Sequence, residues 1–331
     1  MTQHKHLFGA VAALALTCGA AAADPAIIYD LGGKFDKSFN EAAFEGAQRW
    51  ATETGGTFKE LEMQSEAQRE QGMRRLAESG ANPVVLVGFA FSDVVGQVAA
   101  DYPNTKFSVI DGWGDAPNLQ VVSFAEHEGS YLVGLMAGMA SKSNTVGFIG
   151  GMDVPTIRRF ACGYTEGVKA SNPSAKVIIN MTGDTGAAWN DPTKGAELTK
   201  SQISQGADVV YHAAGGTGIG VLQAAADGGI LGIGVDKNQN YLHPGQVLTS
   251  MIKRVDQAVF NAFNAGSDLQ TGQINMDLSS GGVGVAMDEY NATLVSPEML
   301  NKVEEISNQI KEGTLKVHNY TSDDTCPSAN F

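Results

Sequence analysis

The sequence predicts an α/β fold of two lobes, each built on a doubly wound, mostly parallel sheet. After the first 23 residues, short apolar runs alternate with amphipathic segments along the chain, a rhythm typical of βαβ units. The apolar runs are nearly continuous, as in parallel strands buried on both faces. Because the rhythm occurs twice in 331 residues, we expect two similar lobes that face each other across a hinged cleft.

The elements of the first lobe follow from apolar runs for strands and from helical spacing for helices. Phe39, Ala43 and Ala47 recur at helical spacing in the first helix. Ser38 with Glu41 three residues later matches a capping box, so we expect Ser38 to cap this helix. The predicted strands are 26–31, 58–63, 83–89, 107–111 and 121–124, and the predicted helices are 39–53, 66–79 and 93–102.

The second lobe repeats this order. Asp191 followed by Pro192 is a good helix entry, with a capping residue and a proline in the first turn. The predicted strands are 145–150, 176–181, 208–212, 231–236, 247–253 and 281–287, and the predicted helices are 128–141, 156–171, 192–205, 218–227, 255–265 and 297–311.

No low-complexity linker divides the chain into two halves, so we expect each lobe to be built from more than one segment of the chain. Residues 125–128 form a plain passage from strand to helix, so we expect the chain to cross between the lobes more than once. The predicted domains are an N-terminal lobe of 24–126, completed by about 254–280, and a C-terminal lobe of 127–253. Residues 281–331 comprise the last crossing strand, the terminal helix and the tail. The sequence does not decide to which lobe they belong.

The first 23 residues are predicted to be a cleavable signal peptide. A basic start at His4–His6 precedes a short apolar stretch, and three alanines at 21–23 give a small-x-small cleavage pattern before Asp24. We therefore expect export to the periplasm. Cys18 raises the alternative of a lipoprotein, but the residues before it match a lipidation signal poorly.

Charge and motifs exclude several classes of function. The formal net charge of -14 disfavours nucleic acid and anionic lipid as partners. The chain has no G-x-S-x-G, H-E-x-x-H or P-loop motif and no Cys/His cluster, so we expect a binding protein without enzymatic activity, metal or cofactor. A glycine-rich run at 215–220 resembles a dinucleotide-binding loop, but Val221 stands where that motif needs its last glycine.

Cys162 and Cys326 are the cysteines that remain after cleavage of the predicted signal. In an oxidising compartment they are a candidate disulfide, which would tie the C-terminal tail to the body. The alternative is a buried Cys162 that packs as a small apolar residue beside a free Cys326. The sequence leaves this choice open.

Polar and aromatic side chains gather where the predicted strands end. Open α/β sheets bind ligands beyond the carboxyl ends of their strands. The candidates from the first lobe are Asp36, Phe39, Asn40, Phe89 and Asp111, and those from the second are Trp189, Gly215, Asp236 and Lys253.

Each of these residues also has an ordinary structural explanation. Phe39 could belong to the core, Asp36 and Asn40 could only cap the helix, and Lys253 could be a solvated surface lysine. Because Ser38 is expected to fill the capping position, we expect Asp36 and Asn40 to be free for a ligand. The apolar residues before Lys253 favour a side chain that points into a cleft.

Several motifs together resemble one family of exported receptors. They are GKFDKSFN at 33–40, EGSYLVG at 128–134, NDPTKG at 190–195, AAGGTG at 213–218, IGVD at 233–236 and VLTSMIKRVD at 247–256. With them, the chain resembles the basic membrane protein family of ABC-transporter solute receptors, the purine nucleoside receptor A group. The resemblance covers nearly the whole chain after the predicted signal.

This resemblance implies a type I periplasmic-binding-protein fold, in which three segments cross between the lobes. It implies a monomeric receptor that closes on a nucleoside, in particular a purine nucleoside, and delivers it to the permease subunits of an ABC importer. Carried over by position, Asp36 and Asn40 would bind the edge of the base, and Phe39 would stack on it. Asp111, Asp236 and Lys253 would hold the sugar hydroxyls.

A second stacking ring is expected from the C-terminal lobe, where Trp189 is favoured over Tyr211 and His212. The alternatives in function are a receptor for another flat or sugar-like solute, such as riboflavin or a simple sugar, a sensor that shares the same pocket, and a secreted nucleoside hydrolase. Against the hydrolase, the chain lacks the D-x-D-x-D run with which such enzymes hold calcium.

Overall fold

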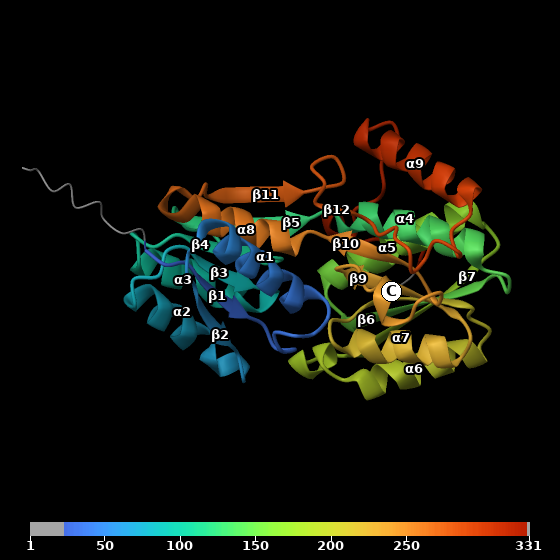
Figure 1. Ribbon diagram of the computed structural model, residues 1–331, viewed down its shortest axis with the longest axis horizontal. Coiled ribbons are helices and arrows are strands. Elements are labelled where there is room, and N and C mark those ends of the chain that lie inside the picture. The colour runs from blue at the N-terminus through green and yellow to red at the C-terminus, as the bar shows by residue number, and fades with distance from the viewer. Residues whose placement is uncertain (1–22, 330–331) are drawn as a thin grey trace, which may run out of the picture.

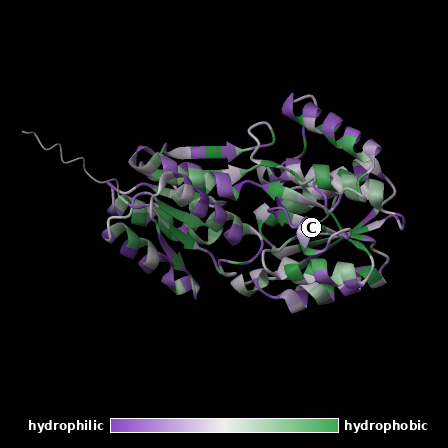
Figure 2. Cartoon of the chain, viewed as in Figure 1, coloured by the Kyte–Doolittle hydropathy of each residue, from purple (hydrophilic) through white to green (hydrophobic). Residues whose placement is uncertain are grey.

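The computed structural model describes residues 23–329, which form two α/β lobes side by side (Figure 1). The predicted signal peptide and Cys18 fall outside these residues, apart from Ala23. Each predicted helix and strand occurs within residues 23–329, and the ends differ by a few residues. The strands at the centre of each lobe are mostly apolar, whereas polar residues concentrate on the outward-facing helices (Figure 2).

The first lobe holds a parallel sheet in the order β11-β5-β4-β3-β1-β2. Successive residues of β1, which lies between β3 and β2, face opposite sides of the sheet, as the strand period requires. Ile27 packs with the buried faces of α1 (Phe39–Thr54) and α8 (Val255–Ala265), and Ile28 packs with those of α2 (Arg69–Glu78) and α3 (Ser92–Asp101). The strands are β1 (Ala26–Tyr29), β2 (Lys59–Glu62), β3 (Val84–Val87), β4 (Phe107–Ile110), β5 (Leu119–Phe124) and β11 (Gly272–Met276).

The second lobe repeats this arrangement in the order β12-β10-β9-β8-β6-β7, with β12 antiparallel to β10. The helices α4 (Glu126–Ala140) and α5 (Pro155–Ser171) pack over one face, and α6 (Pro192–Ser204) and α7 (Thr217–Asp227) over the other. α9 (Pro297–Lys311) packs on α4. The strands are β6 (Thr145–Met152), β7 (Lys176–Gly183), β8 (Val209–Ala213), β9 (Leu231–Asp236), β10 (Val247–Lys253) and β12 (Val283–Val285).

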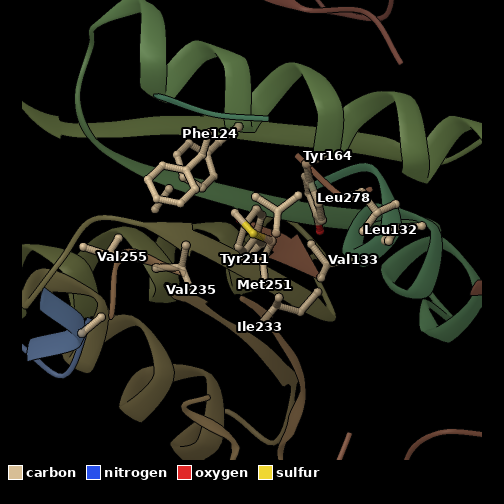
Figure 3. Close-up of a cluster of buried hydrophobic side chains, with 14 of the residues drawn as sticks. Phe124, Leu132, Val133, Tyr164, Tyr211, Ile233, Val235, Met251, Val255 and Leu278 are labelled. Atoms are coloured by element: carbon tan, nitrogen blue, oxygen red, sulfur yellow. The ribbon is translucent and has the colours of Figure 1, made fainter. Parts of the chain in front are cut away.

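A cluster of buried side chains fills the space between this second sheet and its covering helices (Figure 3). Tyr164 of α5 and Tyr211 of β8 lie in it with ring centroids 5.2 Å apart. Phe124 and Val255, which flank two of the crossings between the lobes, belong to the same cluster. The crossing segments are therefore continuous with the core of the second lobe.

The chain passes between the lobes after β5, after β10 and after β11. The backbone ties these passages together, since Ala125 N–H donates to the Met276 carbonyl (3.0 Å) and Arg254 N–H donates to the Gly282 carbonyl (2.9 Å). This connectivity is the expected type I periplasmic-binding-protein fold. The third passage depends on β11, an exposed edge strand of sequence GQINM that the apolar pattern did not predict.

The C-terminal tail, defined here as residues 318–329, lies along α5. The Sγ atoms of Cys162 and Cys326 are 2.11 Å apart and their Cα atoms 5.7 Å apart, an arrangement that suits a disulfide. Tyr320 of this tail is buried. The tail is thereby placed against the helix that supplies part of the cleft.

Candidate ligand-binding cleft

A cleft with about 640 Å³ of empty space lies between the lobes, at the carboxyl ends of the strands. Every residue that we expected from the sequence to bind a ligand lines this cleft: Asp36, Phe39, Asn40, Phe89, Asp111, Trp189, Gly215, Asp236 and Lys253. The carboxyl ends of the parallel strands thus bring together residues separated by more than two hundred positions in the sequence.

The start of α1 differs from the expected capping box. The carboxylate of Asp36, rather than the Ser38 hydroxyl, accepts the N–H groups of Ser38 (2.8 Å), Asn40 (3.0 Å) and Glu41 (3.0 Å). Ser38 instead donates its hydroxyl proton to Asp236 of the other lobe. Burial raises the pKa of Asp36 to about 7, although these three donors act to lower it.

Asn40 holds the loop between β1 and α1. Its Nδ2 donates to the carbonyls of Asp30 (3.2 Å) and Gly33 (3.2 Å), and its Oδ1 accepts the Asp30 N–H (3.3 Å). Both amide protons are therefore committed, and the amide oxygen keeps one lone pair for a ligand. We expected Ser38 to cap α1 and so to leave Asp36 and Asn40 without structural hydrogen bonds. This expectation is wrong, because Asp36 hydrogen-bonds the backbone at the start of α1 and Asn40 that of the loop before it.

Aromatic rings from both lobes face the cleft. The Phe89 and Trp189 ring centroids are 6.4 Å apart at an interplanar angle of 67°. Tyr211 and His212, the alternatives to Trp189, are fully buried and do not line the cleft. Phe160 of α5 also lines it. Strand-end reasoning missed Phe160 because its side chain comes from a helix.

Asp111 and Asp236 occupy equivalent places in the two lobes, directly after β4 and at the end of β9. Both adopt a left-handed backbone, with φ of 59° and 67°, which aspartate tolerates better than most residues. Asp236 Oδ2 accepts the Ser38 hydroxyl, and Asp111 Oδ2 pairs with Lys253. Asp111 Oδ1 is buried without a hydrogen-bond partner.

Lys253 is a buried cation, with a side chain only 2 % exposed. Its Nζ pairs with Asp111 and lies 2.9 Å from Glu126 Oε1. It also lies 5.1 Å and 5.3 Å from the ring centroids of Phe39 and Phe160, within cation–π range. Burial acts to lower the pKa of Lys253, but the carboxylates around it raise the pKa above its ordinary value.

Glu126 is a member of the site that sequence reasoning did not identify. It is fully buried, and its Oε2 lies 2.6 Å from the guanidinium of Arg159. Burial acts to raise the pKa of Glu126, but Arg159 and Lys253 hold it below its usual range. The expected helix began at 128, so Glu126 fell in the passage between the lobes. The signal in the sequence that could have identified Glu126 is a carboxylate in a segment where the chain crosses between the lobes.

Contacts at the rim join the two lobes. Lys237, which follows β9, pairs with Glu41 (2.8 Å) and with Glu45 of α1. Gln239 Nε2 donates to the Lys37 carbonyl (2.9 Å). With the Ser38–Asp236 hydrogen bond, these contacts place the lobes in a closed arrangement.

The charge of the lining restricts the ligand. The carboxyl groups of Asp30, Asp36, Asp111 and Asp236 face the cleft with Lys253 as the cation among the lining residues. An anionic ligand would meet a net negative site, whereas a neutral ligand with hydroxyl donors would find acceptors. The rings suit a flat apolar part of the same ligand.

Two further features concern residues 23–329 only. In this part of the chain no cluster of three or more His, Cys, Asp or Glu side chains is arranged to hold a metal ion. None of the helices in these residues has the length and apolarity to cross a membrane.

Comparison with known proteins identifies relatives over nearly the whole chain. Residues 26–320 match a family model described as ABC transporter substrate-binding protein PnrA-like. The CD4+ T-cell-stimulating antigen of Listeria monocytogenes is 34% identical, over 88% of this chain and 87% of its own length. The ABC transporter nucleoside-binding protein BmpA of Lactococcus lactis is 32% identical, with 88% of each chain covered.

Solved structures have the same fold. A solute-binding protein of an ABC transporter system from Aeropyrum pernix superimposes with a TM-score of 0.82 at 26% identity, covering 91% of this chain and 95% of that one.

Proposed function

Because the chain belongs to the family of PnrA-like ABC transporter substrate-binding proteins, we propose that it captures a nucleoside, in particular a purine nucleoside, and delivers it to a membrane permease. Lobe closure traps the ligand. The observation that carries the proposal is one cleft in which aromatic rings from both lobes lie beside paired carboxylates and a lysine.

The sugar is proposed to lie between Asp111 and Asp236. Carboxylates accept the protons of a vicinal diol, and Asp111 Oδ1 has no other hydrogen-bond partner. Lys253 balances their charge and remains protonated, as its raised pKa requires. A free base would forgo these contacts.

The base is proposed to lie between rings from opposite lobes, with Phe39 on one side and Trp189 on the other. Each stacking contact contributes on the order of 1–3 kcal/mol. Phe89, which borders Trp189, closes the same apolar space. Asp36 and the free lone pair of Asn40 accept donors on the edge of the base, and the Gly215 backbone, at φ 55°, approaches the ligand without a side chain.

The printed name of the Lactococcus lactis relative, a nucleoside-binding protein, supports the same ligand class. The sequence of 1–23 supports export to the periplasm. A receptor that returns its ligand unchanged needs no catalytic group, so we propose a monomeric, non-enzymatic protein whose partners are its ligand and the permease subunits.

A thermal-shift panel tests the ligand class. The mature protein is unfolded and refolded under oxidising conditions to remove carried ligand, then mixed with inosine, guanosine, adenosine, hypoxanthine, riboflavin, glucose or inosine monophosphate. Ligand at about a thousandfold above its dissociation constant stabilises by about 4 kcal/mol. We expect a large rise in melting temperature with the nucleosides, a smaller rise with hypoxanthine, which lacks the sugar, and no rise with the monophosphate.

A shift with riboflavin or glucose alone would contradict the nucleoside assignment and leave the receptor role in place. Chromatography of the inosine samples adds a second readout. Recovery of intact inosine is expected, and release of hypoxanthine would instead identify a nucleoside hydrolase.

A further inference from the structure

The charged residues behind Lys253 form a chain of contacts that leads from the cleft to the C-terminal tail. Lys253 contacts Glu126 Oε1 at 2.9 Å, and Glu126 Oε2 contacts the Arg159 guanidinium at 2.6 Å. Arg159 Nη1 then donates to the Thr321 hydroxyl at 3.3 Å. Thr321 donates its own hydroxyl proton to Asn319 Oδ1 at 2.8 Å, so the hydroxyl is oriented to accept from Arg159.

The tail contacts one face of α5. The N–H of His318 donates to Glu166 Oε2 at 3.1 Å, and Cys326 reaches Cys162. Together with Arg159 these positions recur at helical spacing, so they lie along one side of the helix. The tail is thus fixed to α5 at several points along its length.

A second side of α5, adjacent to the one that contacts the tail, is packed backbone to backbone against α4. A Cβ atom at Gly163 would lie 2.3 Å from the His127 carbonyl oxygen, and one at Gly167 would lie 2.0 Å from that of Tyr131. Both α4 and the tail therefore hold the helix. Arg159 projects from a segment with little freedom to shift.

Burial gives this arrangement its energetic weight. Glu126 is fully buried, and Lys253 faces the carboxylates of Asp111, Glu126 and Asp236. A buried carboxylate that loses one cation stays charged only at a large cost in free energy. Without Arg159, Glu126 would draw on Lys253 alone and compete with Asp111 for it.

We propose that Arg159, held in place by the C-terminal tail, is a positioning residue of the binding cleft. Arg159 neutralises Glu126 on the side away from the cleft. Lys253 can then pair with Asp111 as well as with Glu126, and it points at the ligand. Arg159 does not line the main cleft. The tail and Arg159 therefore set the affinity for the hydroxyl-bearing part of the ligand from outside it, an effect on nucleosides that rests on the proposed function.

The first experiment compares inosine and hypoxanthine binding to Arg159→Met, Arg159→Lys, Thr321→Val and Cys326→Ser by calorimetry. For Arg159→Met we expect about a tenfold weaker affinity for inosine, the size of effect that positioning residues produce. Hypoxanthine binding should stay unchanged, Arg159→Lys should recover part of the loss, and the two tail variants should show smaller losses in the same direction.

Val303→Ala is the control, because Val303 is buried in α9, which packs on α4 and contains none of the residues of the charge chain. It lowers stability without reaching the charge chain, so its affinity for inosine should match that of the wild type. A loss in Val303→Ala as large as in Arg159→Met would assign the effect to stability and overturn the proposal.

A second experiment needs no ligand. Lysine is labelled with the heavy nitrogen isotope, and the ammonium resonance of Lys253, assigned by its loss in Lys253→Met, is recorded by NMR. Its burial should slow proton exchange enough for detection. Thr321→Val and Cys326→Ser, which leave the helix packing intact, should shift or broaden this resonance.

The two experiments separate the two proposals. If the wild type binds no nucleoside while the tail variants still perturb the Lys253 resonance, the proposed function fails and the positioning role stands. An unchanged resonance in the tail variants, or unchanged inosine affinity in Arg159→Met, would refute the positioning role.

Discussion

Single residues at the cleft carry structural and binding duties at once. Asp36 caps α1 with its carboxylate, and Asp236 joins the lobes through Ser38. Substitution of either residue therefore changes more than one contact. A test of a ligand role needs a control that removes the structural contact alone.

Asp236→Ala should weaken inosine binding more than hypoxanthine binding. The lost hydrogen bonds to a charged acceptor contribute about 1.5–3 kcal/mol each, and only the nucleoside has a sugar to use them. Calorimetry with both ligands measures the difference. Ser38→Ala is the control, since it removes the contact between the lobes and keeps the carboxylate. Equal losses for both ligands in Asp236→Ala would remove its sugar role.

Trp189→Ala should weaken the binding of nucleoside and free base alike, by on the order of 1–3 kcal/mol, because stacking involves the base. Trp113→Ala is a matched control, since Trp113 is 57 % exposed and does not line the main cleft. The same calorimetric assay applies. Unchanged affinity would transfer the second stacking position to Phe89 or Phe160, since Tyr211 and His212 do not reach the cleft.

The pH dependence of stability should reflect Asp36. Its pKa rises from an ordinary 3.8 to about 7 because of burial, so the folded state binds this proton more tightly than the unfolded state does. Its contribution is fully present below pH 3.8 and is lost as the pH rises through about 7. Burial also lowers the pKa of His127 and His212 to about 4, which acts in the opposite direction, so the test compares slopes. Between about pH 4 and 7.5, the melting temperature of ligand-free wild type should fall more, or rise less, with pH than that of Asp36→Asn.

Asp30 and Asp111, whose pKa values burial raises to about 6, act in the same direction as Asp36 and still titrate in Asp36→Asn. Val98→Ala is the control, because Val98 is buried in the same lobe and its substitution changes no titrating group. It should lower every melting temperature and keep the wild-type slope. A wild-type slope in Asp36→Asn would contradict the assignment.

At the scale of elements, α5 connects the cleft to the rest of the second lobe. It supplies Phe160 to the cleft and Arg159 to Glu126, and it packs on α4 through glycines. The close approach of α4 and α5 exists because Gly163 and Gly167 carry no side chain. Any atom added there meets backbone that cannot rotate away.

Gly163→Ala should destabilise the protein by about 1–3 kcal/mol through overpacking. The added Cβ would lie 2.3 Å from the His127 carbonyl oxygen, so α4 and α5 must separate. The midpoint of urea unfolding measures the loss. Gly284→Ala is the matched control, because a Cβ there meets nothing within 4 Å. Equal midpoints for the two variants would mean that the helices are free to separate.

At the scale of the whole molecule, we expect the contacts at the rim to stabilise the closed arrangement of the lobes relative to an open one. Lys237 of the second lobe holds Glu41 and Glu45 of the first, and Gln239 holds the Lys37 carbonyl. These contacts lie outside the main cleft, since neither Lys237 nor Gln239 lines it. They therefore bias closure without touching a ligand.

Lys237→Ala should lower the closed population and weaken inosine binding severalfold, because apparent affinity scales with the fraction of competent protein. Small-angle X-ray scattering of ligand-free Lys237→Ala should give a larger radius of gyration. Lys302→Ala, which breaks an exposed pair with Glu305 in α9, is the control and should change neither quantity. A Lys237→Ala protein as compact as the wild type would show that other contacts hold the closed state.

The local pattern of the chain by itself determined the alternation of strands and helices, the two-lobed fold and the residues at the strand ends. These depend on short-range periodicity and on the rule that parallel strands end at one edge, and both are present in the sequence. The strand β11 escaped this reasoning because it is exposed and polar, so only its pairing with β5 defines it.

The tertiary structure alone decided which partner each polar group takes. Ser38 has the pattern of a cap, but Asp236, nearly two hundred residues away, accepts its proton, and Asp36 takes over the cap. Glu126 joins the site because Arg159 and Lys253 converge on it from separate elements. A sequence pattern records spacing along one element, whereas pairing of buried charges depends on distances between elements, which exist only once the lobes have packed.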